Sequence, residues 1–218
     1  GRARTMAASE AADKCLRTLE GHTGVVFSVV TFFDARRDGW CALTASDDNT
    51  AKVWDVETGE HLRTLTGHSD WVMTAVAFLD TSAGDGAGAW RALTGSFDKS
   101  MKLWDMDTGE CLRTLAGHRL EVRSVAVFPD AETGQWRVLS GSGDRTAKVW
   151  DVATGECLCT LAGHARSIMS VAAFFDTRVG KPCALTGSED TTAKVWDMAT
   201  GECLSTLEEH TQPVYCVC

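Results

Sequence analysis

Residues 117–151 decide the fold of this chain, and they read GHRLEVRSVAVFPDAETGQWRVLSGSGDRTAKVWD. The stretch opens with Gly-His and closes with Trp-Asp, and both dipeptides recur in phase along the 218 residues. Trp-Asp stands at residues 54–55, 104–105, 150–151 and 196–197, whereas Gly-His stands at 21–22, 67–68, 117–118 and 163–164. Successive copies are 46 or 50 residues apart, and a further copy begins at Glu209-His210. A fixed period of this length is typical of repeat architectures.

Within one period, short apolar-polar alternations between turn residues predict four strands. In the third unit the expected strands are Val122–Phe128, Arg137–Ser142, Thr146–Trp150 and Cys157–Leu161. The turn before the last strand contains a glycine in every unit, at Gly59, Gly109, Gly155 and Gly201. We expect a positive φ there, because glycine adopts it most easily.

These dipeptides and their spacing resemble the WD-repeat family over four complete copies, from about Cys15 to Leu207. The resemblance implies an all-β fold, a β-propeller built from four-stranded antiparallel blades. It also implies a structural tetrad of hydrogen-bonded side chains in each blade. Carried over position by position, the tetrads are His22, Thr44, Asp48 and Trp54; His68, Thr94, Asp98 and Trp104; His118, Ser140, Asp144 and Trp150; and His164, Thr186, Asp190 and Trp196.

The tetrad residue types also build the catalytic triads of hydrolases. An active site is ordinarily unique, whereas this set occurs four times at equivalent positions, so we interpret it as structural. Buried polar groups need partners, and these four side chains can satisfy one another. We therefore expect no catalytic residues and no enzyme activity.

The resemblance implies blades at about residues 20–66, 67–116, 117–162 and 163–208, with a partial fifth unit at 209–218 and a flexible N-terminal segment at 1–14. An orphan fourth strand is expected at Cys15–Leu19, and a first strand at Val214–Cys218. WD-repeat propellers commonly have seven blades. We therefore expect the four blades to be an incomplete part of a larger, seven-bladed ring.

Comparison of the repeats separates core from surface. The fourth and tenth residues after each repeat histidine are uniformly apolar and predict core positions: Val26, Val72, Val122 and Ile168, and Phe32, Phe78, Phe128 and Phe174. The third and fifth residues vary, and the resemblance places them, with the residue before each tetrad aspartate, on the face around the central channel. The candidate partner-binding residues are Phe27, Trp71, Met73, Phe97, Arg123, Met169 and Tyr215. Aromatic, Met and Arg side chains are enriched in protein interfaces.

The net charge of −9 disfavours nucleic acid and anionic membranes as partners, because phosphate binding needs a basic patch. No apolar stretch approaches the ~20 residues of a membrane-spanning helix. Among nine cysteines, Cys111, Cys157 and Cys203 share one repeat position, and Cys41 and Cys183 share another. We interpret them as small apolar fillers and reduced thiols, which predicts a cytoplasmic or nuclear protein. The pairs Cys157/Cys159 and Cys216/Cys218 lack a second pair that would complete a metal site, so we expect no metal or cofactor.

The leading functional hypothesis is a non-catalytic scaffold that presents a propeller face to peptide or protein partners in a multiprotein complex. A narrower version is the substrate-recognition module of a ubiquitin ligase, in which Arg123 and Arg145 would read phosphopeptides. A second alternative is a signalling subunit resembling the G-protein β subunit, suggested by Trp71–Thr74 but without a coiled-coil helix before Cys15. An enzyme on a propeller scaffold would need a unique polar constellation, and the sensor half of a large immune protein is a fourth alternative.

Overall fold

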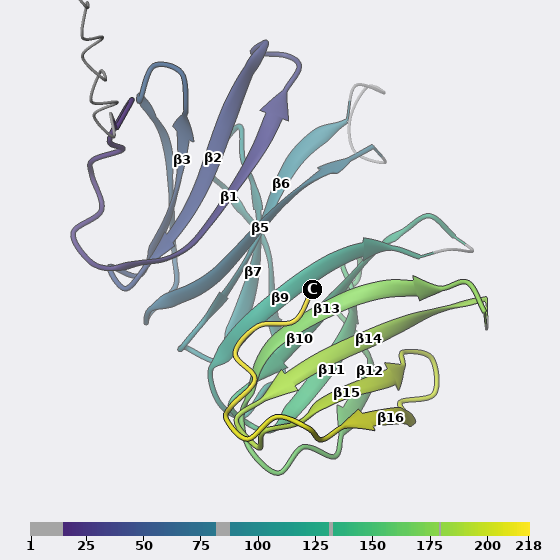
Figure 1. Cartoon of the computed structure of the whole chain (residues 1–218). Coiled ribbons are helices and arrows are strands. Elements are labelled where there is room, and N and C mark those ends of the chain that lie inside the picture. The colour runs from purple at the N-terminus through teal and green to yellow at the C-terminus, as the bar shows by residue number, and fades with distance from the viewer. Residues whose placement is uncertain (1–14, 82–87, 131–132, 179) are drawn as a thin grey trace, which may run out of the picture.

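The computed structural model describes residues 15–81, 88–130, 133–178 and 180–218, and all of its regular structure is β (Figure 1). Four four-stranded antiparallel sheets follow one another, each a meander of consecutive strands. The first comprises β1 (Val26–Asp34), β2 (Gly39–Ser46), β3 (Thr50–Asp55) and β4 (His61–Thr66), and the second β5 (Val72–Asp80), β6 (Ala89–Ser96), β7 (Ser100–Asp105) and β8 (Cys111–Ala116). The third comprises β9 (Val122–Pro129), β10 (Trp136–Ser142), β11 (Thr146–Asp151) and β12 (Cys157–Ala162), and the fourth β13 (Ile168–Asp176), β14 (Lys181–Ser188), β15 (Ala193–Asp197) and β16 (Cys203–Leu207). These sheets are the blades of a propeller, which confirms the expected fold class.

The turns between strands use the residues that their backbone geometry requires. Gly59, Gly109, Gly155 and Gly201 have φ values of 78–79°, which confirms the expected positive φ. In this turn of the first blade, just before Gly59, the Thr58 amide donates to Asp55 Oδ1 at 2.7 Å. The repeated Asp-x-x-Thr-Gly sequence therefore closes the turn that leads into the outer strand of each blade.

The blades stack through their first strands. β5 packs on β1, β9 on β5 and β13 on β9, so the sheets form an arc in which no comparable contact joins the fourth described blade to the first (Figure 1). At each junction an apolar residue of the next blade is completely covered: Val72, Val122 and Ile168 are 0% exposed. The Ala75 amide also donates to Ser28 Oγ at 3.3 Å, and the Val171 amide donates to Ser124 Oγ at 3.2 Å.

Two core predictions are wrong, and both concern the flanks of the arc. Val26 is 46% exposed, although its equivalents in the other blades are covered. Phe174 is 41% exposed, whereas Phe32 and Phe78 are buried. In both cases the described residues include no neighbouring blade that could cover the side chain.

The two terminal segments occupy strand positions without forming strands, so the expected strands at Cys15–Leu19 and Val214–Cys218 are not present. Each segment is nevertheless anchored. Arg17 Nη1 donates to the Thr58 carbonyl at 2.7 Å, and the Val217 amide donates to Ser170 Oγ at 3.1 Å. The Val217 bond repeats the Ser–amide bonds of the blade junctions, so this segment follows the path of a next first strand along the fourth blade (Figure 1). The predicted flexible segment 1–14, like residues 82–87, lies outside the described residues.

The cysteines that recur at equivalent repeat positions divide into two classes. Cys41 and Cys183 are buried, as expected of small apolar fillers, but Cys111, Cys157 and Cys203 are exposed on the outer strands, so the filler interpretation is wrong for them. Their thiols contact the carbonyl two residues ahead at 3.4–3.5 Å. The outer strands have no neighbouring strand on one edge, and these three cysteines lie in solvent there.

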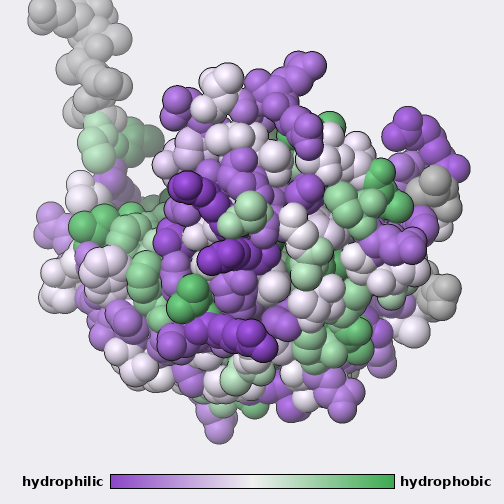
Figure 2. Space-filling model, turned by 90° about the horizontal axis from the view of Figure 1, so that it is seen from below, coloured by the Kyte–Doolittle hydropathy of each residue, from purple (hydrophilic) through white to green (hydrophobic). Residues whose placement is uncertain are grey.

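The surface seen from below mixes hydrophilic and hydrophobic residues, with the apolar side chains in small separate groups (Figure 2). Among the described residues, no helix has the length and apolar character needed to cross a membrane.

Candidate functional site

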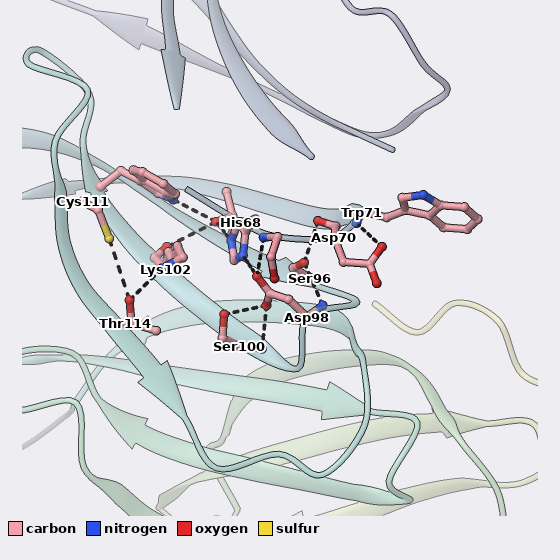
Figure 3. Close-up of polar contacts among 12 residues, drawn as sticks. His68, Asp70, Trp71, Ser96, Asp98, Ser100, Lys102, Cys111 and Thr114 are labelled. Atoms are coloured by element: carbon pink, nitrogen blue, oxygen red, sulfur yellow. Dashed lines mark hydrogen bonds and ion pairs between the residues drawn. The ribbon is translucent and has the colours of Figure 1, made fainter. Parts of the chain in front are cut away.

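The repeat histidines, hydroxyls, aspartates and tryptophans meet inside their own blades. In the second blade, His68 Nδ1 lies 2.7 Å from Asp98 Oδ2, and His68 Nε2 lies 2.8 Å from Thr94 Oγ1 (Figure 3). The indole of Trp104 donates to the same Thr94 hydroxyl at 2.8 Å. The same three contacts occur at 2.7–2.8 Å in the other blades. A neutral imidazole can donate to the carboxylate and accept from the hydroxyl, so one continuous chain runs from indole to aspartate.

Each tetrad aspartate also ties two loops together. Asp98 accepts hydrogen bonds from the Ser69 amide at 3.1 Å and from the Ser100 hydroxyl at 2.6 Å, so it links the loop before β5 to the turn between β6 and β7. Both loops lie beside Trp71 and Phe97. The tetrads therefore hold in place the loops that carry the candidate partner-binding residues.

The tetrads lack the accessibility that catalysis requires. Thr94, Ser140 and Thr186 are 0% exposed, and each hydroxyl already contacts both an indole and an imidazole. A nucleophile must reach the substrate, and these hydroxyls cannot. Within the described ranges, moreover, no three His, Cys, Asp or Glu side chains are placed to hold a metal ion.

The titration of the tetrads predicts that acid destabilises the fold in two stages. Burial lowers the pKa of His164 below its ordinary 6.5, and the hydrogen bond to Asp190 does not reverse this. Burial alone would raise the pKa of Asp48, but hydrogen bonds from Thr50 and His22 outweigh it and lower the pKa to about 2. The pKa values of Asp98, Asp144 and Asp190 are lowered in the same way.

Folding lowers the pKa of both kinds of group. The contribution of each group to the stability of the fold is therefore complete above its unfolded pKa and is lost as the pH falls through its folded pKa. The melting temperature should therefore decrease first as the pH falls below about 6.5, and again below about 3.8 as the carboxylates approach protonation. Calorimetric scans from pH 8 to pH 2 test this, and His164→Gln should remove the contribution of His164 to the first stage. A melting temperature that stays constant down to pH 2 would contradict the assigned network.

The first strand of each blade carries a β-bulge at one of the variable positions. The register shifts between Val26 and Ser28, which leaves Phe27 outside the regular pairing, and equivalent shifts occur at Met73, Arg123 and Met169. A bulge changes the direction of a side chain and is common next to functional sites. The fifth position after the repeat histidine is therefore free to differ between blades.

A backbone contact brings two other variable positions together in each blade. The Phe97 amide donates to the Trp71 carbonyl at 2.9 Å, and the same bond joins Asp47 to Val25, Gly143 to Glu121 and Glu189 to Ser167. In the second blade both positions carry aromatic rings. The indole of Trp71 points away from the His68–Asp98 network of its own blade (Figure 3).

Four of the seven candidate partner-binding residues form a continuous chain of contacts, here called the rim cluster: Phe27, Trp71, Phe97 and Arg123. The ring centroids of Phe27 and Trp71 are 6.0 Å apart, and those of Trp71 and Phe97 are 5.3 Å apart. The Arg123 guanidinium lies 5.8 Å from the centroid of the Phe97 ring, within cation–π distance. The rim cluster thus spans three consecutive blades, while Phe27 remains 40% and Trp71 44% exposed.

The other three candidates are not part of this chain of ring contacts. Met73 and Met169 are half-buried, and Tyr215 lies exposed on the terminal segment, without a ring contact to any described residue. Sequence reasoning gave no role to Glu121, which accepts from Arg123 Nη2 at 2.7 Å and from Nε at 3.0 Å. A Cβ at Gly143 would lie 2.4 Å from Glu121 Oε1, so this glycine leaves room for the ion pair. In the sequence, this ion pair is indicated by Gly143, which stands at a position where the other repeats have Asp, Phe or Glu.

A comparison with protein families matches four stretches to the family described as WD domain, G-beta repeat: residues 13–55, 59–105, 109–151 and 155–197. Comparison with curated proteins gave no match. Repeats of this family generally mediate protein–protein interactions, and proteins that carry them are generally non-catalytic. The matched stretches cover most of the chain, and each contains one complete tetrad, so the chain belongs to the WD-repeat family.

Proposed function

We propose that this protein is a non-catalytic scaffold that holds peptide or protein partners on the rim cluster. The observation that carries the proposal is the unbroken contact of Phe27, Trp71, Phe97 and Arg123 across three blades. Scattered apolar residues are ordinary on a protein surface, whereas a group of exposed aromatic side chains is the informative feature.

The energetics of interfaces support this assignment. A few buried Trp, Tyr and Arg anchors usually supply most of the binding free energy. The half-exposed rings of Phe27 and Trp71 can bury further apolar area against a partner. Because the tetrads hold the supporting loops, little side-chain and loop entropy remains to be lost on binding.

The charge at the rim argues for an apolar contact over phosphate recognition. Glu121 pairs with Arg123 and compensates its charge, which weakens the hypothesis of a phosphopeptide reader. Arg145 is exposed, but a single Arg is a poor counterpart for a dianion. The free thiols of all nine cysteines support a compartment that keeps cysteine reduced, such as the cytoplasm.

Simultaneous Trp71→Ala and Phe97→Ala substitution should abolish partner capture while leaving the fold intact. Two aromatic anchors lost at the centre of an interface should weaken binding by about tenfold or more. The measurement is quantitative affinity capture from extracts of the source cells, followed by titration of the captured partners against purified variants. Melting temperatures report the integrity of each variant.

A matched control is available at the other end of β1, the strand that carries Phe27. Phe33 and Trp40 also form an exposed aromatic pair, with centroids 5.7 Å apart. The Phe33→Ala/Trp40→Ala variant removes similar rings and should retain the partners that the rim variant loses. Equal retention by both variants would exclude the rim cluster as the binding site.

A further inference from the structure

Three equivalent clefts lie between consecutive blades, at the strand ends opposite the rim cluster. One blade contributes the end of its first strand and the start of its outer strand to each cleft. The next blade contributes the start of its second strand and the turn after its third strand. Because the repeats place equivalent residues around each cleft, differences between the clefts can be assigned to individual substitutions.

The cleft between the first and second blades is closed. Met106 and Asp107 fill it, together with Trp90, whose ring centroid lies 4.4 Å from that of Phe32. Arg36 Nη1 reaches across to Asp107 Oδ2 at 2.9 Å, and Arg63 Nε donates to the Asp107 carbonyl at 2.8 Å. The space that remains is about 10 Å³, too small for any ligand.

The cleft between the second and third blades is open. Val152 and Ala153 stand where the first cleft has Met106 and Asp107, so a long side chain and an inter-blade ion pair are both missing. The cleft volume is about 360 Å³, which lies within the usual range for small-molecule sites. Leu112 is 43% exposed there, whereas the equivalent Leu62 packs against the cluster that contains Met106.

The lining of this open cleft combines an apolar floor with a positive charge. Leu103, Val152 and Trp136 supply the apolar part, and the Trp136 ring is held 4.8 Å from that of Phe78. Two guanidinium groups also line the cleft. Arg91 is paired with Asp105, so its charge is compensated.

Arg113 donates Nη1 to the Thr154 carbonyl at 3.0 Å, but no described carboxylate lies within ion-pair distance of it. A guanidinium at the edge of an apolar pocket favours a carboxylate, which can accept two parallel hydrogen bonds. A single guanidinium matches one negative charge, which favours a monoanion over a phosphate dianion.

The third cleft provides an internal comparison. Between the third and fourth blades, Cys159 replaces Arg113 and Pro182 replaces Trp136, and the volume is about 180 Å³. That cleft thus lacks the equivalents of the Arg113 guanidinium and the Trp136 indole, although Phe128 lines it.

We propose that the cleft between the second and third blades binds a monoanionic ligand in which a carboxylate adjoins a branched or aromatic apolar group. Its apolar part lies against Trp136, Leu103 and Val152, and its carboxylate pairs with Arg113. Free carboxylic acids and peptide carboxyl termini share this chemistry. The site is separate from the rim cluster and does not depend on the proposed function.

The test is calorimetric titration of the whole chain with N-acetyl-L-phenylalanine, with its uncharged carboxamide, and with a tripeptide that ends in a free phenylalanine carboxylate. We expect the acid to bind about tenfold or more tightly than the carboxamide, because only the acid can pair with Arg113. Tighter binding of the tripeptide than of the acid would identify a peptide terminus as the source, and the reverse order would identify a small acid. No binding of either carboxylate would overturn the proposal.

Two variants locate the binding. Val152→Met/Ala153→Asp places in this cleft the two residues that fill the first cleft and should abolish binding, whereas Arg113→Gln should remove the preference for the acid over the carboxamide. The Trp71→Ala/Phe97→Ala variant should bind the acid as the wild type does, which separates this proposal from that for the rim. Unchanged affinity and unchanged acid preference in both cleft variants would show that the ligand binds elsewhere and would overturn the assignment.

Discussion

Replacement of Trp150 by alanine is expected to lower the free energy of unfolding by about 3–5 kcal/mol, the usual range for the loss of a large core ring. The indole is completely buried and donates to Ser140 Oγ at 2.8 Å. It also belongs to a cluster that includes Phe78 and Leu93 of the preceding blade, so one side chain supports both its own blade and a junction. Alanine would leave a cavity at that junction and a buried Ser140 hydroxyl without its indole donor.

Thermal and urea unfolding measure this effect. For a chain of this size, about 1 kcal/mol corresponds to roughly 2–4 °C, so the melting temperature should fall by about 6–20 °C. Trp40→Ala is the matched control, because Trp40 is half-exposed and makes no tetrad contact. Equal losses in the two variants would contradict the assignment of Trp150 to a buried network.

Gly141→Ala is expected to destabilise the junction between the third and fourth blades by about 1–3 kcal/mol through overpacking. A Cβ at this position would lie 2.7 Å from both Ile168 Cγ2 and Val171 Cγ1. The equivalent position in the first blade is Ala45, which is tolerated in a junction where Ala75 replaces Val171. Junctions thus combine a small residue on one blade with a complementary one on the next.

A double-mutant cycle tests this complementarity. Val171→Ala alone should cost about 1–3 kcal/mol by leaving a cavity. Combined with Gly141→Ala it should reproduce the natural alanine pair of the first junction, with a coupling energy of at least about 0.5 kcal/mol in the stabilising direction. Strictly additive losses would show that the two side chains do not share the same space.

The sequence predicted the fold well because its signals are local and repeated. The strand order, the turn glycines and the partners of each tetrad follow from residue types at a constant spacing, and each blade closes these interactions within itself. The rim was only partly predictable. Phe27, Trp71 and Phe97 were recognised by their variability, but the contacts that join them cross blade boundaries, and the bulge at Phe27 has no sequence signature of its own.

By itself the sequence determined that each period of 46 or 50 residues becomes one sheet, because the residues that satisfy its buried polar groups all lie within that period. Tertiary structure alone decided which equivalent residues are buried. Val26 and Val72 occupy the same repeat position, yet one is half-exposed and the other covered, because only Val72 has a blade packed against it. The tertiary structure also decided that the second cleft is open and the first closed. Burial and cavity volume depend on residues of the neighbouring blade, which a local sequence pattern does not contain.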